Sequence, residues 1–233
     1  MAYIGLRKPY VAKYNRAANT YSECFKYSHA VSLAITPNYS EASLYGDDMQ
    51  VEYERAFTNA AISMGTTSTP LQAASVVFGH QVDTANKKVI RKATDDSNYV
   101  GVGVIAPEKV DGENKFSAAI VISAKFSDSA LNFTTKGESL AFATPTIEGN
   151  AIANDNGEWL ITRTFDTENE AKFFVEDFLN YPPQYQKVTP AGTENPKALG
   201  WYEKNQVGTS SEYTYTLTND TSVTAQKDYY ERV

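Results

Sequence analysis

The stretch YVGVGVI at residues 99–105 decides the fold class, because it is an apolar run with the length and the valine content of a buried strand. A second apolar run, FSAAIVISAKF, spans residues 116–126. Between them lies Asp111-Gly112, and an Asp-Gly pair flanked by strand-like sequence is typical of a hairpin turn, since the turn needs positive φ angles that glycine adopts without steric cost. The two runs are predicted to pair as a β-hairpin.

Shorter alternating runs on both sides extend the strand prediction along the chain. Residues 31–35 alternate apolar and polar before the turn-like TPN at residues 36–38. Residues 159–165 alternate after another turn-like stretch, NDNG at residues 154–157. The chain is therefore expected to be mainly β.

Two segments show helical spacing of apolar residues. The first, about residues 69–79, carries a capping box at Thr69 and Gln72. The second, about residues 167–180, opens with a capping box at Thr167 and continues with one apolar stripe. Each helix is short and should cover one face or edge of a sheet. The expected fold is a β-sandwich or barrel with these two flanking helices.

The composition changes near residue 184, where aliphatic residues become scarce and Thr, Ser, Asn, Pro and Gly become frequent. Tyr213 and Tyr215 alternate with polar neighbours in this tail. We expect a β domain over residues 1–183 and a C-terminal extension over residues 184–233, an extended arm that orders on a neighbouring surface.

Charge and cysteine content exclude several classes of protein. The 233 residues carry 21 Lys and Arg against 28 Asp and Glu, a net charge of −7, so the chain lacks the cationic surface of a dedicated nucleic-acid-binding module. Cys24 is the only cysteine, which rules out a scaffold held by intrachain disulfides. The most apolar stretch, residues 118–122, is too short to span a bilayer, and the expectation is folding in a reducing cytoplasm without membrane insertion.

Motifs for catalysis or cofactor binding are not convincing. GVGVIA at residues 101–106 matches a dinucleotide-binding fingerprint by letter, but Pro107 and a hairpin follow where a helix is required, so small residues in a tightly packed strand are the better interpretation. His29 and His80 are the only histidines, and no nucleophile motif accompanies them. We predict no enzyme, no cofactor and no metal site. A hydrated divalent ion at the Asp47-Asp48 pair is the alternative to a solvated turn.

Four segments carry a specific resemblance: MAYIGLRKP at residues 1–9, ITPNYSEASLYGDD at residues 35–48, YVG at residues 99–101 and NGEW at residues 156–159. In their order and spacing they resemble the major tail protein family of long-tailed bacteriophages. The resemblance covers about residues 1–180. It implies a tail tube β-sandwich with a flanking helix that forms hexameric rings, stacked around a tape-measure protein and later conducting double-stranded DNA without binding it specifically.

The resemblance also implies partners and interface residues. Family members stack their rings through terminal arms and a long loop between early strands, which maps to about Tyr39–Asp48. The implied partners are further copies of the chain, the tape-measure protein, the tail terminator and the distal tail or baseplate proteins, in a virion tail assembled in the host cytoplasm. The tyrosine-rich composition, with 16 Tyr, is also typical of interfaces. Interface candidates are Tyr39, Tyr45, Asp47, Asp48, Arg7, Tyr213 and Tyr215.

Two other classes of function are kept open. One is a monomeric β-sandwich carbohydrate-binding or adhesion module, whose tyrosines would stack on sugar rings. The other is an enzyme with an unrecognised site. If the chain forms a tube, its net charge predicts a predominantly negative lumen, because acidic lining lets DNA slide whereas Lys and Arg would hold its phosphates.

Overall fold

The computed structural model describes residues 2–128, 144–190, 194–206, 213–220, 222–223 and 227–233. The chain divides into two compact units, Met1–Tyr181 and Pro182–Val233, and each is described on its own. Over the described residues the protein is mainly β, with antiparallel sheets and two helices, which confirms the predicted fold class.

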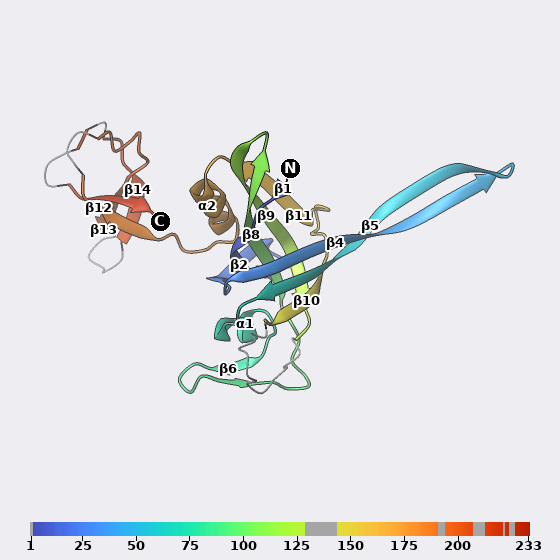
Figure 1. Ribbon diagram of the computed structural model, residues 1–233. Coiled ribbons are helices and arrows are strands. Elements are labelled where there is room, and N and C mark those ends of the chain that lie inside the picture. Colours follow the sequence, from blue (N-terminus) through green and yellow to red (C-terminus); the bar gives the residue numbers. More distant parts are fainter. Residues whose placement is uncertain (1, 129–143, 191–193, 207–212, 221, 224–226) are drawn as a thin grey trace, which may run out of the picture. The chain divides into compact units, whose positions relative to one another are not determined.

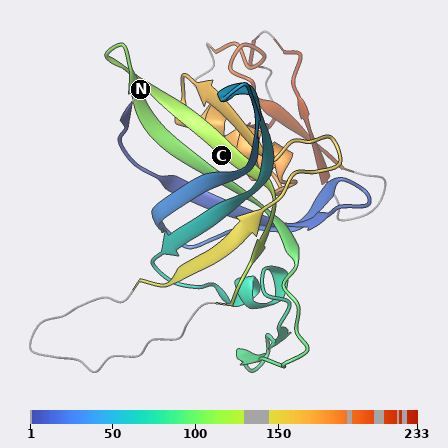
Figure 2. The same ribbon diagram turned by 90° about the vertical axis from the view of Figure 1, so that its right-hand side faces the viewer.

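The first unit is built around one large antiparallel sheet (Figures 1 and 2). Its strand order is β3-β2-β8-β9-β10-β5-β4, with β1 added beside β8 and β11 added beside β9. The strands are β1 (Ala2–Tyr3), β2 (Arg7–Asn15), β3 (Thr20–Lys26), β4 (Ala30–Gly46), β5 (Met49–Thr66), β8 (Tyr99–Val110), β9 (Glu113–Phe126), β10 (Thr146–Ala151) and β11 (Leu160–Phe165). A small separate hairpin pairs β6 (Gln81–Asp83) with β7 (Lys88–Ile90).

The hairpin at the centre of the sheet is the predicted one. β8 pairs with β9, and Val110 lies opposite Glu113 next to the turn. The turn residues Asp111 and Gly112 have φ angles of 51° and 89°. Alternate side chains of these strands enter two separate cores on the two faces of the sheet. Because both faces are covered, the strands need no polar alternation, and this explains their continuous apolar sequence.

Each helix covers one face of the sheet. Helix α1 (Leu71–Val76) contributes to the core that β5 and β10 also line, and α2 (Glu168–Phe178) packs over β8 and β9 on the other face. The capping box of α2 is confirmed: the Thr167 hydroxyl accepts from the Glu170 amide at 3.2 Å, and the Glu170 carboxylate accepts from the Thr167 amide at 3.1 Å.

The capping box predicted for α1 is wrong. The N-cap is Pro70, which makes no side-chain capping bond, so Thr69 lies one position too early to cap the helix. The helix has six residues, shorter than the predicted range of 69–79. Gly79 adopts a φ of 70° after the helix has ended.

Glycines 101 and 103 allow α2 to lie close to the sheet. A Cβ atom at Gly103 would collide with Val175 and lie 3.0 Å from Leu179, and one at Gly101 would collide with Tyr21 and lie 2.9 Å from Leu179. Val175 and Leu179 are fully buried. The G-x-G pattern therefore serves packing, as the structural interpretation of the sequence predicted.

Strands β4 and β5 correct the prediction of a turn at residues 36–38 and of a long loop at about Tyr39–Asp48. Both strands continue far past the rest of the sheet as a two-stranded ribbon, with its turn at Asp47 and Asp48 (Figure 1). Both turn residues have positive φ, 51° and 62°. Pro37 lies inside β4 opposite Ala60 and is accommodated because β4 ends the strand order of the sheet, where a missing N–H breaks no ladder bond.

The second unit replaces the expected extended arm with a folded sheet. Its strands follow the order β12-β15-β13-β14 and are β12 (Tyr185–Val188), β13 (Tyr202–Gln206), β14 (Tyr213–Leu217) and β15 (Tyr229–Arg232). The rings of Tyr185 and Tyr215 stack with centroids 4.1 Å apart although their strands lie at opposite ends of that order, so the sheet is strongly curled. Trp201 and Tyr229 are also buried, and this aromatic packing gives the short segment a core of its own.

Candidate functional site

The most prominent surface feature is the outer part of the β4–β5 ribbon, residues 38–57, here called the arm. Most of its apolar side chains are exposed rather than packed: Tyr45 and Met49 are each 68% exposed, and Leu44, Val51 and Tyr53 are also exposed. Exposed apolar side chains gathered on one projecting element are typical of interaction surfaces. The arm is therefore the leading candidate for a functional site.

A series of contacts between aromatic and charged side chains fixes the arm to the body. The Trp159 ring stacks on Phe57 with centroids 4.8 Å apart, and Tyr39 meets Phe57 edge-on at 6.0 Å. The Arg55 guanidinium lies 3.7 Å from the centre of the Tyr39 ring and 3.4 Å from the Glu41 carboxylate. The base of the arm is thus held in one orientation by stacking and cation–π contacts.

The arm is strongly acidic. It carries Glu41, Asp47, Asp48, Glu52 and Glu54 against the single base Arg55, a net charge of −4 out of −7 for the whole chain. All five carboxylates belong to exposed residues. Among the described residues, no group of three or more His, Cys, Asp and Glu is arranged to hold a metal ion.

The structure brings four of the predicted interface residues together on one element. Tyr39, Tyr45, Asp47 and Asp48 all lie on the arm. Arg7 lies on β2 and pairs with Glu168 at 2.7 Å, at the start of α2. Tyr215 lies in the second unit; the backbone of Tyr213 is in the same strand, but its side chain is outside the described residues.

His80 forms a charged cluster that the sequence did not reveal. Its Nδ1 lies 2.8 Å from Asp95 Oδ2 and its Nε2 lies 3.1 Å from Asp128 Oδ2, and Arg91 Nε also donates to Asp128, at 2.9 Å. Ionised carboxylates only accept, so His80 makes both bonds only when both ring nitrogens carry protons. The imidazole thus lies between two carboxylates.

This cluster fixes the base of the β6–β7 hairpin, because His80 precedes β6 and Asp95 follows β7. The Lys92 backbone amide, together with His80, holds the pKa of Asp95 below its ordinary value. A carboxylate with a lowered pKa in the folded state contributes stability above its unfolded pKa and loses it as the pH falls through the folded pKa.

We expect Asp95→Asn to lower the urea midpoint of unfolding at neutral pH, with the difference from the unsubstituted chain shrinking as the pH falls below the unfolded pKa of Asp. The asparagine keeps the shape but loses the charge that attracts His80 and the Lys92 amide. Urea titrations across acidic and neutral pH measure the effect. Asp111→Asn in the exposed β8–β9 turn is the matched control, and an equal pH response in both variants would contradict the assignment.

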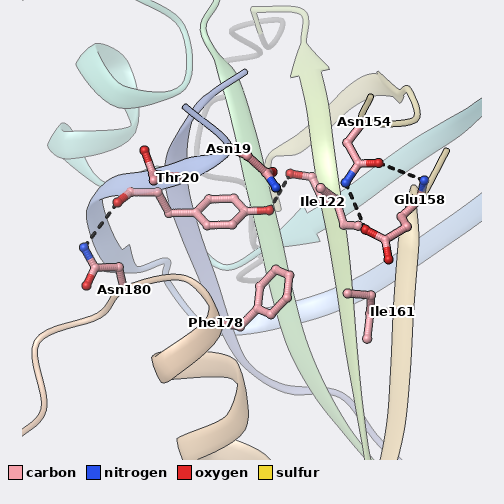
Figure 3. A pocket seen from close by; sticks show the side chains of 9 residues that line it. Asn19, Thr20, Ile122, Asn154, Glu158, Ile161, Phe178 and Asn180 are labelled. Carbon is pink, nitrogen blue, oxygen red and sulfur yellow. Dashed lines mark hydrogen bonds between the residues drawn. The ribbon is translucent and has the colours of Figure 1, made fainter. Parts of the chain in front are cut away.

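A hollow of about 460 Å³ lies between the β2–β3 turn, β9 and the end of α2 (Figure 3). The polar groups that line it already bind one another: the Tyr21 hydroxyl donates to the Ile122 carbonyl at 2.9 Å, and the Asn180 amide donates to the Tyr21 carbonyl at 3.2 Å. Asn154 likewise donates to Glu158 and accepts from its backbone. These bonds hold local structure together, and they leave few groups to orient a ligand.

Cys24, the only thiol, is half-buried on β3. Burial, with a smaller effect of nearby Glu176, raises the pKa of this thiol to about 12. It therefore stays protonated near neutral pH, which is the state of an unreactive cysteine.

Comparison with known proteins adds no assignment. None of the helices in the described part of the chain is long and apolar enough to cross a membrane. The chain matches no model of a known protein family, and no curated protein matches it significantly.

Proposed function

We propose that the protein is a structural, self-assembling subunit of a phage tail tube, without catalytic activity. The observation that carries the proposal is the arm, which exposes Leu44, Tyr45, Met49 and Val51 on a ribbon that projects from the body (Figure 1). An arm of this kind gains a partner for its apolar side chains when it lies against another copy of the chain.

The edges of the sheet support the same proposal. β3 and β4 end its strand order, so each presents backbone groups that a neighbouring copy can pair with. In a monomer such edges favour aggregation, whereas in a closed ring each is covered by the next subunit. The remaining parts of the proposal are implied by the sequence resemblance. They are the hexameric ring, the tape-measure, terminator and baseplate partners, the passage of double-stranded DNA and the virion location.

Electron microscopy and sedimentation velocity of the purified chain over a range of concentrations test the proposal. Rings or long tubes of uniform width are the expected result. A chain that stays monomeric at high concentration and binds glycans would overturn it in favour of the carbohydrate-binding or adhesion module.

The carbohydrate alternative has weaker structural support. Sugar recognition by stacking needs aromatic faces open to the ligand, but the Tyr185 and Tyr215 rings stack on each other, and Tyr202 meets Tyr185 edge-on at 4.9 Å. These rings serve mainly as the core of the second unit.

A further inference from the structure

A second exposed hairpin in the first unit has the opposite charge to the arm. Residues 81–92, here called the basic hairpin, comprise β6, β7 and the two residues that follow. They carry Lys87, Lys88, Arg91 and Lys92, all exposed, against the single acid Asp83, a net charge of +3. Asp83 is occupied by Asn86, whose side chain donates to it at 2.7 Å and whose backbone amide donates at 3.2 Å.

The cations of this hairpin are available to a partner. Lys87 and Lys88 form no ion pair with any residue that the structure describes, whereas Arg91 already binds Asp128. The His80 cluster holds the base of the hairpin, so the charges are presented on a fixed element.

The arm cannot meet the basic hairpin of its own chain. Figure 1 shows the arm leaving the body away from β6. A contact between a surface of −4 and one of +3 must therefore join two copies. Complementary charge of this kind steers association and fixes which surfaces meet.

We propose that the acidic arm of one copy docks on the basic hairpin of a second copy. This rests on the proposed self-assembly and names the surface that receives the arm. Glu52 and Glu54 share one face of the arm, because side chains two residues apart in a strand point the same way, and in the docked pair they face Lys87 and Lys88.

Charge reversal tests the pairing in the full chain. Glu52→Lys with Glu54→Lys, or Lys87→Glu with Lys88→Glu, should each raise the concentration needed for assembly by about tenfold or more. Combining the four changes should restore assembly, because the charges are complementary again. The matched control is Lys109→Glu with Lys197→Glu, an equal change in net charge at exposed lysines elsewhere, which should assemble like the unsubstituted chain.

Disulfide trapping tests the contact without requiring a ring or tube. In a Cys24→Ser background, one chain carries Glu52→Cys and the other Lys88→Cys, and the mixture is oxidised. A mixed dimer is expected, and Lys109→Cys in place of Lys88→Cys should give none.

The outcomes separate this inference from the proposed function. If the chain forms tubes but the reversals leave assembly unchanged and no mixed dimer forms, the docking is overturned and the tube stands. If the mixed dimer forms while no tube is ever seen, the docking is supported and the proposed tube function is overturned. If the Lys87 and Lys88 changes alter only retention of double-stranded DNA, the basic hairpin is a nucleic-acid contact and the docking is overturned.

Discussion

Gly103→Val is expected to destabilise the first unit by about 3 kcal/mol, at the upper end of what overpacking a core usually costs. The first added carbon already collides with Val175 and lies 3.0 Å from Leu179, and both side chains are fully buried. Helix α2 must therefore move off the sheet or β8 must distort. Urea denaturation followed by circular dichroism measures the loss as a lower midpoint.

Gly5→Val is the control for this substitution. Gly5 is exposed, and an added Cβ there meets only Pro107, at 3.9 Å, so its effect should stay within about 0.5 kcal/mol. Equal midpoints for Gly103→Val and the unsubstituted chain would show that α2 does not press on β8 as described.

Replacing residues 41–55 with Asn-Gly is expected to abolish assembly while leaving the fold intact. The replacement keeps the pair of Ser40 and Ala56 and closes it with a turn suited to a two-residue hairpin. It removes the exposed apolar and acidic side chains and leaves the stacking of Trp159 on Phe57. Sedimentation velocity should show only monomer at concentrations where the unsubstituted chain assembles, and the circular dichroism of the body should be retained.

Ser40→Thr with Ser43→Thr keeps the arm at full length and serves as its control. Threonine suits an exposed strand, so this variant should assemble normally. Rings or tubes formed equally well by the shortened chain would remove the arm from the assembly mechanism.

The parts of the fold that the sequence predicts well are those with local signals. The hairpin around Asp111-Gly112 is encoded by two apolar runs and a turn that only a few residue types adopt. Helix α2 is encoded by Thr167 and Glu170, whose reciprocal bonds lie within one turn. Neither feature depends on residues far away in the sequence.

The arm is harder to predict because no face of it is buried in its own chain. Strand prediction relies on apolar residues that alternate toward a core, and residues 38–57 have no core to face. Pro37 suggests a turn, and the true turn uses Asp47 and Asp48 in place of the expected Asn-Gly or Asp-Gly. The pairing of β4 with β5 in the arm extends outward from residues 60–65 of β5, which β10 holds in the sheet.

The charged cluster of His80 and the pairing of Arg7 could not be predicted from one sequence. His80 meets Asp128 across 48 positions, and Arg7 meets Glu168 across 161. Such contacts follow from the order of strands in the sheet, which periodicity does not encode.

The structure also shows where the net negative charge of the chain is located. With −4 on the arm, the remainder of the chain carries −7 − (−4) = −3. The negative surplus is thus concentrated on one element instead of being spread over the surface. A negative lumen remains a prediction, and it would have to come from carboxylates of the body or from the placement of the arm itself.

Pro37 has a consequence for the protein before it meets any partner. The outer edge of β4 is a long row of backbone donors, and such rows can template the stacked, self-propagating sheets of amyloid. At Pro37 the row has a gap, because proline has no N–H to offer. An added strand loses one ladder hydrogen bond there, which disfavours fibril growth along this edge relative to an edge without proline.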